Sequence, residues 1–183
     1  MNYMQIEITD VGPDTGERHI VVESPNDVEF GVFDGYKTGE DGIARPATAP
    51  WMDGEMIQAV LIATVDVSIS PSGRDGPEIK PNEENSTEYH NHTFVGSITS
   101  VHESGTELLC DTSLYDGLDQ TDSGIGVVDS PEPVAVLSTG EGDILLNISD
   151  MDTDPADLDL SVIYDVCAGR TDVLGYVQDA EFN

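Results

Sequence analysis

The chain has 183 residues, of which 37 are Asp or Glu and only 6 are Lys or Arg, giving a formal net charge of −31. Nucleic-acid binding needs clustered basic side chains for phosphate contacts, and the few lysines and arginines here are scattered, so we expect no direct nucleic-acid partner. A hydrophobic content of 38%, arranged in strand-like patterns, excludes a disordered chain.

The first part of the chain alternates between short apolar segments and turn residues. Apolar side chains recur at every second position over residues 5–9, 18–22 and 28–33, which predicts three strands. The stretch Gly35–Gly54 is rich in Gly, Pro and charged residues, and it is expected to be a long irregular connection. Loops of this length are usually functional or form interfaces.

The clearest strand pattern is the stretch Met56–Ile69. Its second face is apolar at Val60 and Ile62 but polar toward the end, which predicts a long central strand whose second face is partly covered. The cover is either the same chain or a neighbouring copy, and in the second case Val60 and Ile62 are candidate subunit contacts. The fully apolar face consists of Ile57, Ala59, Leu61, Ala63, Val65, Val67 and Ile69.

The rest of the chain has further short apolar segments separated by polar loops, with no convincing amphipathic helix. About eight to ten strands in one domain, residues 1–183, are therefore expected, which is typical of an all-β sandwich or barrel. The expected elements are a long loop over 70–86, a hairpin of 89–102 with 107–112, strands at 133–137 and 143–148, an acidic loop over 150–157, and a closing hairpin of 158–166 with 171–177.

Three histidines are candidate metal ligands. His90 and His92 are two positions apart and therefore share one strand face, and His102 lies on the same predicted hairpin. The set is loosely similar to a cupin motif, but Glu84 stands where that motif has a glycine and the second cupin motif has no counterpart. The alternative is that these are surface or interface histidines.

A run of aspartates beginning at residue 150 starts like a calcium-binding loop. Pro155 replaces the turn glycine and Ser161 replaces the final glutamate, so the pattern excludes an EF-hand. A looser structural cation site and a solvated acidic loop both remain open. The candidate ligands are Asp150, Asp152, Asp154 and Asp157.

The sequence shows no catalytic or cofactor signature, such as a nucleophile elbow or a phosphate-binding glycine loop, so we expect neither an enzyme nor a cofactor. Cys110 and Cys167 are either buried thiols or a disulfide. No secretory signal and no transmembrane segment are visible, so we expect synthesis in the cytoplasm without export.

The acidic residues are spread along the whole chain instead of forming a tail. A charge of this size would repel itself in dilute buffer, whereas at molar salt the Debye length falls to roughly 3 Å. Together with the near absence of lysine, this distribution indicates adaptation to a high-salt environment.

These features resemble one family of proteins in particular. The chain is similar to the smaller major capsid protein of halophilic archaeal icosahedral viruses that carry an internal membrane. The resemblance covers nearly the whole chain and rests on its uniform acidity and on the stretches MNYMQIEITDVGPDTGERH, GEMIQAVLIATVDVSIS and LDLSVIYDVCAGRTDVLGYVQ.

The resemblance implies an upright single jelly roll in a virion capsid, made in the host cytoplasm. Its implied partners are itself and a larger second major capsid protein in pseudo-hexameric capsomers, then neighbouring capsomers and membrane-associated virion proteins. Tyr36 and Trp51 are candidate interface anchors, because aromatic side chains dominate interface hot spots. The alternatives are a cupin-like metal- or ligand-binding jelly roll and a halophilic surface adhesin or spike.

Overall fold

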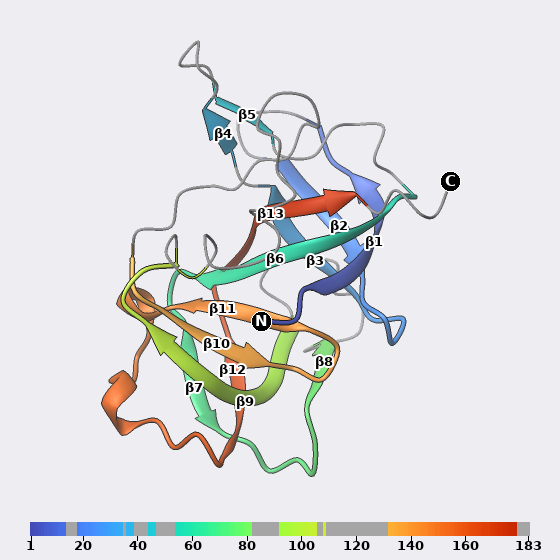
Figure 1. The fold of residues 1–183 in the computed structure, drawn as a ribbon. Helices are drawn as coiled ribbons and strands as arrows, with labels where there is room; N and C mark the ends of the chain where they lie inside the picture. The colour runs from blue at the N-terminus through green and yellow to red at the C-terminus, as the bar shows by residue number, and fades with distance from the viewer. Residues whose placement is uncertain are drawn as a thin grey trace.

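The computed structural model describes residues 1–13, 18–34, 36–38, 44–46, 54–81, 92–105, 108 and 132–178. Within these ranges the regular structure is almost entirely β, and eleven strands belong to one continuous sheet (Figure 1). Two short 3₁₀ turns, η2 (Ile148–Asp150) and η3 (Pro155–Asp157), interrupt the β-structure. The all-β prediction is confirmed.

Most strands are short, and their bounds follow the predicted segments closely in the first half of the chain. The strands are β1 (Met4–Val11), β2 (Arg18–Glu23), β3 (Glu29–Asp34), β4 (Tyr36–Thr38), β5 (Ala44–Pro46), β6 (Met56–Thr64), β7 (Ser68–Pro71), β8 (Glu78–Pro81), β9 (His92–His102), β10 (Val134–Ser138), β11 (Asp143–Asn147), β12 (Ile163–Cys167) and β13 (Arg170–Gln178).

Five strands close into a barrel, which occupies the upper half of the view in Figure 1. Their order is β1-β2-β3-β13-β6, and β6 pairs with β1 to complete the ring. The barrel is mixed, because β13 runs parallel to β3 while its other pairings are antiparallel. Closure removes the free edges that an open sheet would present.

The remaining strands of the sheet extend from the barrel and form the lower half of the view. From β6 the order continues as β11-β10-β9-β12-β7, and β8 pairs with β9 off this path. The junction between β6 and β11 is parallel, with Leu145 opposite Ile62. In the described arrangement the sheet is thus closed at one end and terminates in two edge strands, β7 and β8.

The main core runs through both parts of the sheet. In β1 the side chains of Met4, Ile6 and Ile8 are fully buried, while the intervening residues are partly exposed, as the alternation predicted. The same apolar cluster includes Leu137 of β10 and Tyr164 of β12, so it joins the barrel to the outer strands. The assignment of residues 1–183 to a single domain stays a prediction.

The stretch predicted as one long central strand is in fact two strands. β6 ends at Thr64 because Val65 and Asp66 adopt left-handed conformations, with φ of 58° and 50°. Val67 and Ile69 are nevertheless buried on the same core as the odd-numbered residues of β6. The alternation was therefore right about the burial of these residues but wrong about Val65, which is 47% exposed, because it could not detect the bend in the backbone.

The predicted closing hairpin is wrong, whereas most of the predicted partner strand 107–112 of the other hairpin lies outside the described residues. β12 and β13 follow each other in sequence but do not pair, because β12 lies between β9 and β7 whereas β13 lies between β3 and β6. β9 pairs with β8, β10 and β12. Beyond β9, the Leu108 amide donates to the Ser104 carbonyl at 3.2 Å, as in a helical turn, and residues 109–112 lie outside the described ranges.

The two long connections contain short strands. The stretch Gly35–Gly54 includes β4 and β5, which form a separate antiparallel pair. The stretch over 70–86 includes the end of β7 and all of β8. No helix among the described residues is long and apolar enough to cross a membrane.

Candidate functional site

The candidate histidines are not gathered into a site in the part of the chain that the structure describes. His92 begins β9 and is only 3% exposed, and its ring packs against Phe30 and Phe94 with centroid distances of 5.0 and 4.7 Å. His102 lies at the opposite end of this strand of 11 residues, with its Nε2 at 2.9 Å from Ser100 Oγ. His90 lies outside the described residues.

His92 therefore behaves as a core residue. Its Nε2 lies 3.3 Å from the hydroxyl of Thr171, a fully buried residue of β13. This contact links the start of β9 to a strand of the barrel. Among the described residues, no three His, Cys, Asp or Glu side chains form a group that could hold a metal ion.

The described cysteine, Cys167, is a free thiol at the end of β12. Its sulfur lies 3.2 Å from the Thr93 hydroxyl on the neighbouring strand β9. Cys110 lies outside the described residues.

The candidate aspartates have structural partners in this chain. One carboxylate oxygen of Asp150 accepts from the Val65 amide at 3.2 Å and from the side-chain amide of Asn147 at 2.8 Å. It therefore supports the left-handed bend between β6 and β7. A carboxylate bound to backbone amides stabilises a bend without any ion.

Asp152 and Asp154 act in the same way at neighbouring positions. Asp152 Oδ1 accepts from the Ile69 amide at 3.2 Å, on the outer edge of β7. Asp154 caps η3, where its Oδ1 accepts from the Ala156 amide at 2.9 Å. A cation at these aspartates stays a prediction.

A further acidic residue in this region, Asp159, is held by a single serine. Its carboxylate accepts from both the hydroxyl of Ser161, at 2.6 Å, and the Ser161 amide, at 2.9 Å. These two hydrogen bonds lower the pKa of Asp159. Ser161, which stands where a calcium-binding loop would have its final glutamate, therefore binds the nearby Asp159 carboxylate.

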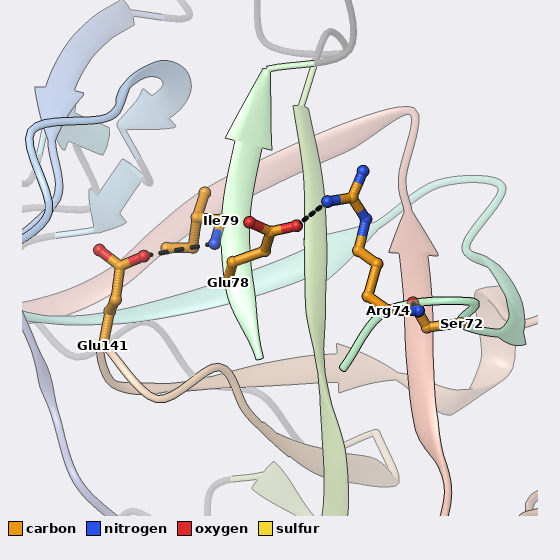
Figure 2. Close-up of polar contacts among 5 residues, drawn as sticks. All are labelled: Ser72, Arg74, Glu78, Ile79 and Glu141. Atoms are coloured by element: carbon orange, nitrogen blue, oxygen red, sulfur yellow. Dashed lines mark hydrogen bonds and ion pairs between the residues drawn. The ribbon is translucent and has the colours of Figure 1, made fainter. Parts of the chain in front are cut away.

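A polar cluster lies where the turn between β10 and β11 meets β8, and Figure 2 shows Glu141 beside Ile79 there. Glu141 accepts from the Ile79 amide at 3.3 Å through one carboxylate oxygen and from the Asn26 amide at 3.2 Å through the other. This single side chain therefore connects β8 to the turn between β2 and β3. Sequence reasoning did not identify it, because its partners are 62 and 115 residues away.

An ion pair joins Arg74, in the loop between β7 and β8, to Glu78 at the start of β8, as Figure 2 also shows. The Arg74 amide donates to the Ser72 hydroxyl at 3.2 Å. Both charged side chains are well exposed to solvent, so the pair orders the loop more than it stabilises the fold.

Three glutamates lie side by side across the barrel strands β1, β2 and β3. The register places Glu7 opposite Glu23, and Glu23 opposite Glu29. Partial desolvation raises the pKa of Glu23, and the charges of Asp27, Glu7 and Glu29 raise it further. Like charges directly opposite each other destabilise a sheet, so this acidic row is a local source of repulsion.

The interface candidates of the central strand are buried within one copy of the chain. Val60 is 0% and Ile62 is 4% exposed. They belong to a second apolar cluster on the other face of the sheet, so the cover comes from the same chain and these residues do not form an exposed contact surface. The other buried members of this cluster are Val134, Val136, Leu145 and Leu174.

The side chains of the two aromatic interface candidates lie outside what the structure describes. Tyr36 is the first residue of β4, and Trp51 lies outside the described residues. Contact of either with a neighbouring subunit stays a prediction.

Comparison with known proteins found no match to a family model, to a curated protein or to a solved structure.

Proposed function

We propose that the protein is a structural subunit of a viral shell that assembles in high salt, similar to the smaller major capsid protein suggested by its sequence. The observation that carries the proposal is the combination of a net charge of −31 with an all-β fold built around a closed barrel. Such a subunit needs a rigid body, and it needs surfaces that repel one another until salt screens them.

The proposal includes the finer fold assignment, an upright single jelly roll. The closed barrel and the continuous core support a single rigid body. Two parallel pairings, β13 with β3 and β11 with β6, differ from the antiparallel pairing on which jelly rolls are built. The jelly-roll assignment therefore depends mainly on the sequence resemblance.

In this proposal the chain works by contact with other subunits and not by catalysis. Its partners are copies of itself and a larger second major capsid protein in pseudo-hexameric capsomers, with neighbouring capsomers and membrane-associated virion proteins around them. The virion capsid is its location, after synthesis in the host cytoplasm. The structural roles of Asp150, Asp152 and Glu141 support this reading, because they use polar side chains to stiffen the body.

The test is the salt dependence of association. The purified chain should form defined oligomers in molar KCl and dissociate on dialysis to about 0.1 M salt, where the Debye length is about 10 Å. Sedimentation velocity measures the mass, and electron microscopy shows whether rings or sheets form. A folded chain that stays monomeric at every salt and protein concentration, alone and with co-purified virion proteins, contradicts the proposal.

Elemental analysis of the same sample tests the metal-binding alternative. Stoichiometric zinc, iron or manganese that is lost in a His92→Ala/His102→Ala variant would favour a metal-dependent barrel over a capsid subunit. Sub-stoichiometric metal, unchanged by the substitutions, agrees with the buried aromatic setting of His92.

A further inference from the structure

The two strands at the open ends of the sheet carry the same short pattern. β7 contains Ile69 and Pro71, and β8 contains Ile79 and Pro81, so in each strand an isoleucine is followed two positions later by a proline. Successive residues of a strand point their backbone groups to opposite sides, so residues two apart share a side. The geometry shows which side this is.

In β7 the backbone polar groups of Ile69 and Pro71 point away from the partner strand β12. The Ser72 amide donates to the Ile163 carbonyl of β12 at 2.7 Å, so the even-numbered residues face β12. The Ile69 amide points the other way and donates to Asp152 Oδ1 at 3.2 Å. The next amide on this outer side would belong to residue 71, and proline has none.

Just before β7, at Val67, the same outer edge is covered by the backbone of the acidic loop at residues 150–152. The Val67 amide donates to the Asp150 carbonyl at 2.9 Å, and the Asp152 amide donates to the Val67 carbonyl at 3.0 Å. Val67 and Met151 thereby form a parallel bridge. From residue 67 to residue 71, every outward backbone donor is therefore either bonded within the chain or absent.

The same arrangement recurs on β8, at a separate place in the fold. Ile79 is opposite Phe94 of β9, yet its amide donates to Glu141 Oε1 at 3.3 Å and so points away from β9 (Figure 2). The next outward position is Pro81, which again has no amide. Glu141 is fixed in turn by the Asn26 amide, which binds its other carboxylate oxygen.

We propose that these carboxylate–proline pairs close both edges of the sheet to strand addition by a second copy of the chain. An added strand must both donate to and accept from the edge, and the outer sides of β7 and β8 offer carbonyl acceptors alone. Copies then meet through side chains and not through backbone pairing. This inference concerns the edges themselves and stands or falls independently of the proposed shell function.

The first test uses the unmodified protein. Amide hydrogen exchange in molar KCl should show the Ile69 and Ile79 amides protected by about tenfold or more over unstructured amides, although both lie on outer edges. Exchange of these two amides at the unstructured rate would overturn the proposal.

The second test opens one edge at a time in the full chain. Glu141→Ala with Pro81→Thr leaves two unbonded outward amides on β8, at positions 79 and 81. Asp152→Ala with Pro71→Thr leaves two on β7, at positions 69 and 71. Each variant should show an average mass that rises at least twofold above that of the wild type as protein concentration increases. Amides of the opened strand should exchange more slowly in the associated form.

The matched control is Glu103→Ala with Pro13→Thr, which makes the same kinds of substitution at two exposed positions away from both edges. It should keep the wild-type mass at every concentration. Edge variants that remain folded by circular dichroism and also keep the wild-type mass would overturn the proposal. If one edge variant fails to fold, the other edge and the exchange test decide.

Discussion

Gly96 shows how closely two strands of this sheet approach each other. A Cβ placed on it would lie 2.1 Å from the carbonyl oxygen of Ser138 on β10 and 2.8 Å from the carbonyl carbon. Both are backbone atoms, so a rotamer change cannot relieve the contact. The absence of a side chain at this position is therefore a requirement of strand packing.

We expect Gly96→Ala to lower the free energy of unfolding by about 1–3 kcal/mol, the usual cost of overpacking a well-packed interior. Gly73→Ala is the control, because a Cβ there meets no atom within 4 Å and should change stability by less than about 0.5 kcal/mol. Urea denaturation in molar KCl measures both. Equal stability of the two variants would show that β9 and β10 can separate without cost.

The acidic row of Glu7, Glu23 and Glu29 makes a second residue-scale prediction. Because the folded protein raises the pKa of Glu23 above its ordinary value of 4.5, the folded state binds this proton more tightly than the unfolded chain does. Stability from this group therefore falls as pH rises from that ordinary value through the raised pKa. Glu23→Gln removes the effect.

The Glu23→Gln variant should melt at a higher temperature than the wild type at neutral pH and low salt. The difference should vanish at a pH well below 4.5, where Glu23 is protonated in both states, and should shrink as salt is added. Glu103→Gln, outside the row, is the control. A melting difference that does not change with pH would mean that charge repulsion is not its cause.

At the scale of an element, the break between β6 and β7 decides how the second half of the sheet is laid out. Val65 has a φ of 58°, a conformation that is unfavourable for a β-branched residue. The bend is held by Asp150, which binds the Val65 amide, and by the Gly169 amide, which donates to the Val65 carbonyl at 2.7 Å. Three separate parts of the chain thus fix one turn.

Val65→Gly should raise the free energy of unfolding by about 1 kcal/mol, because relief of the left-handed strain exceeds the added freedom of the unfolded chain. Val101→Gly is a matched control, since both valines are 47% exposed but Val101 lies within β9. It should be destabilising, as glycine is in a strand. Thermal denaturation compares them, and a loss of stability in both would indicate that the bend carries little strain.

At the scale of the whole molecule, the charge of −31 dominates how the fold responds to its solvent. Repulsion among exposed carboxylates acts over about 10 Å at 0.1 M salt and over about 3 Å at 1 M. The barrel and its extension share one core, so the repulsion opposes the packing of the whole molecule and not of one loop.

The melting temperature should therefore rise steeply between about 0.1 and 1 M KCl and then level off, because screening is nearly complete by then. Differential scanning calorimetry of the unassembled chain at low protein concentration measures this without a contribution from association. A protein of similar size and near-zero net charge serves as the control. A melting temperature that is unchanged or falls over this range would exclude charge repulsion as the main destabilising force.

Residue patterns predicted much of the local structure correctly. Alternation located β1, β2, β3 and β6 within a few residues, since a buried sheet face selects apolar side chains at every second position. Short apolar segments located β10 and β11, which are buried at four consecutive positions. The same reasoning failed at Val65, where a residue type that favours strands stands in a left-handed turn held by distant partners.

The candidate site was less accessible to sequence reasoning. Spacing alone placed His92 and His102 on one strand, but β9 carries them to opposite ends, and the core encloses the first. The aspartates at 150 and 152 looked like ion ligands because their partners, backbone amides more than 80 residues away, leave no trace in the local sequence. The role of Glu141 was not predicted, because its partners are also distant in the sequence.

Composition and periodicity by themselves determined that this chain is an acidic all-β protein with a substantial core, because those properties depend on side-chain chemistry and short-range alternation. Only the tertiary structure decided that five strands close into a mixed barrel, that β12 and β13 separate, and that carboxylates bind the outer amides of β7 and β8. Strand partners and edge contacts depend on which backbone groups meet across long sequence separations, and side-chain order carries little information about that.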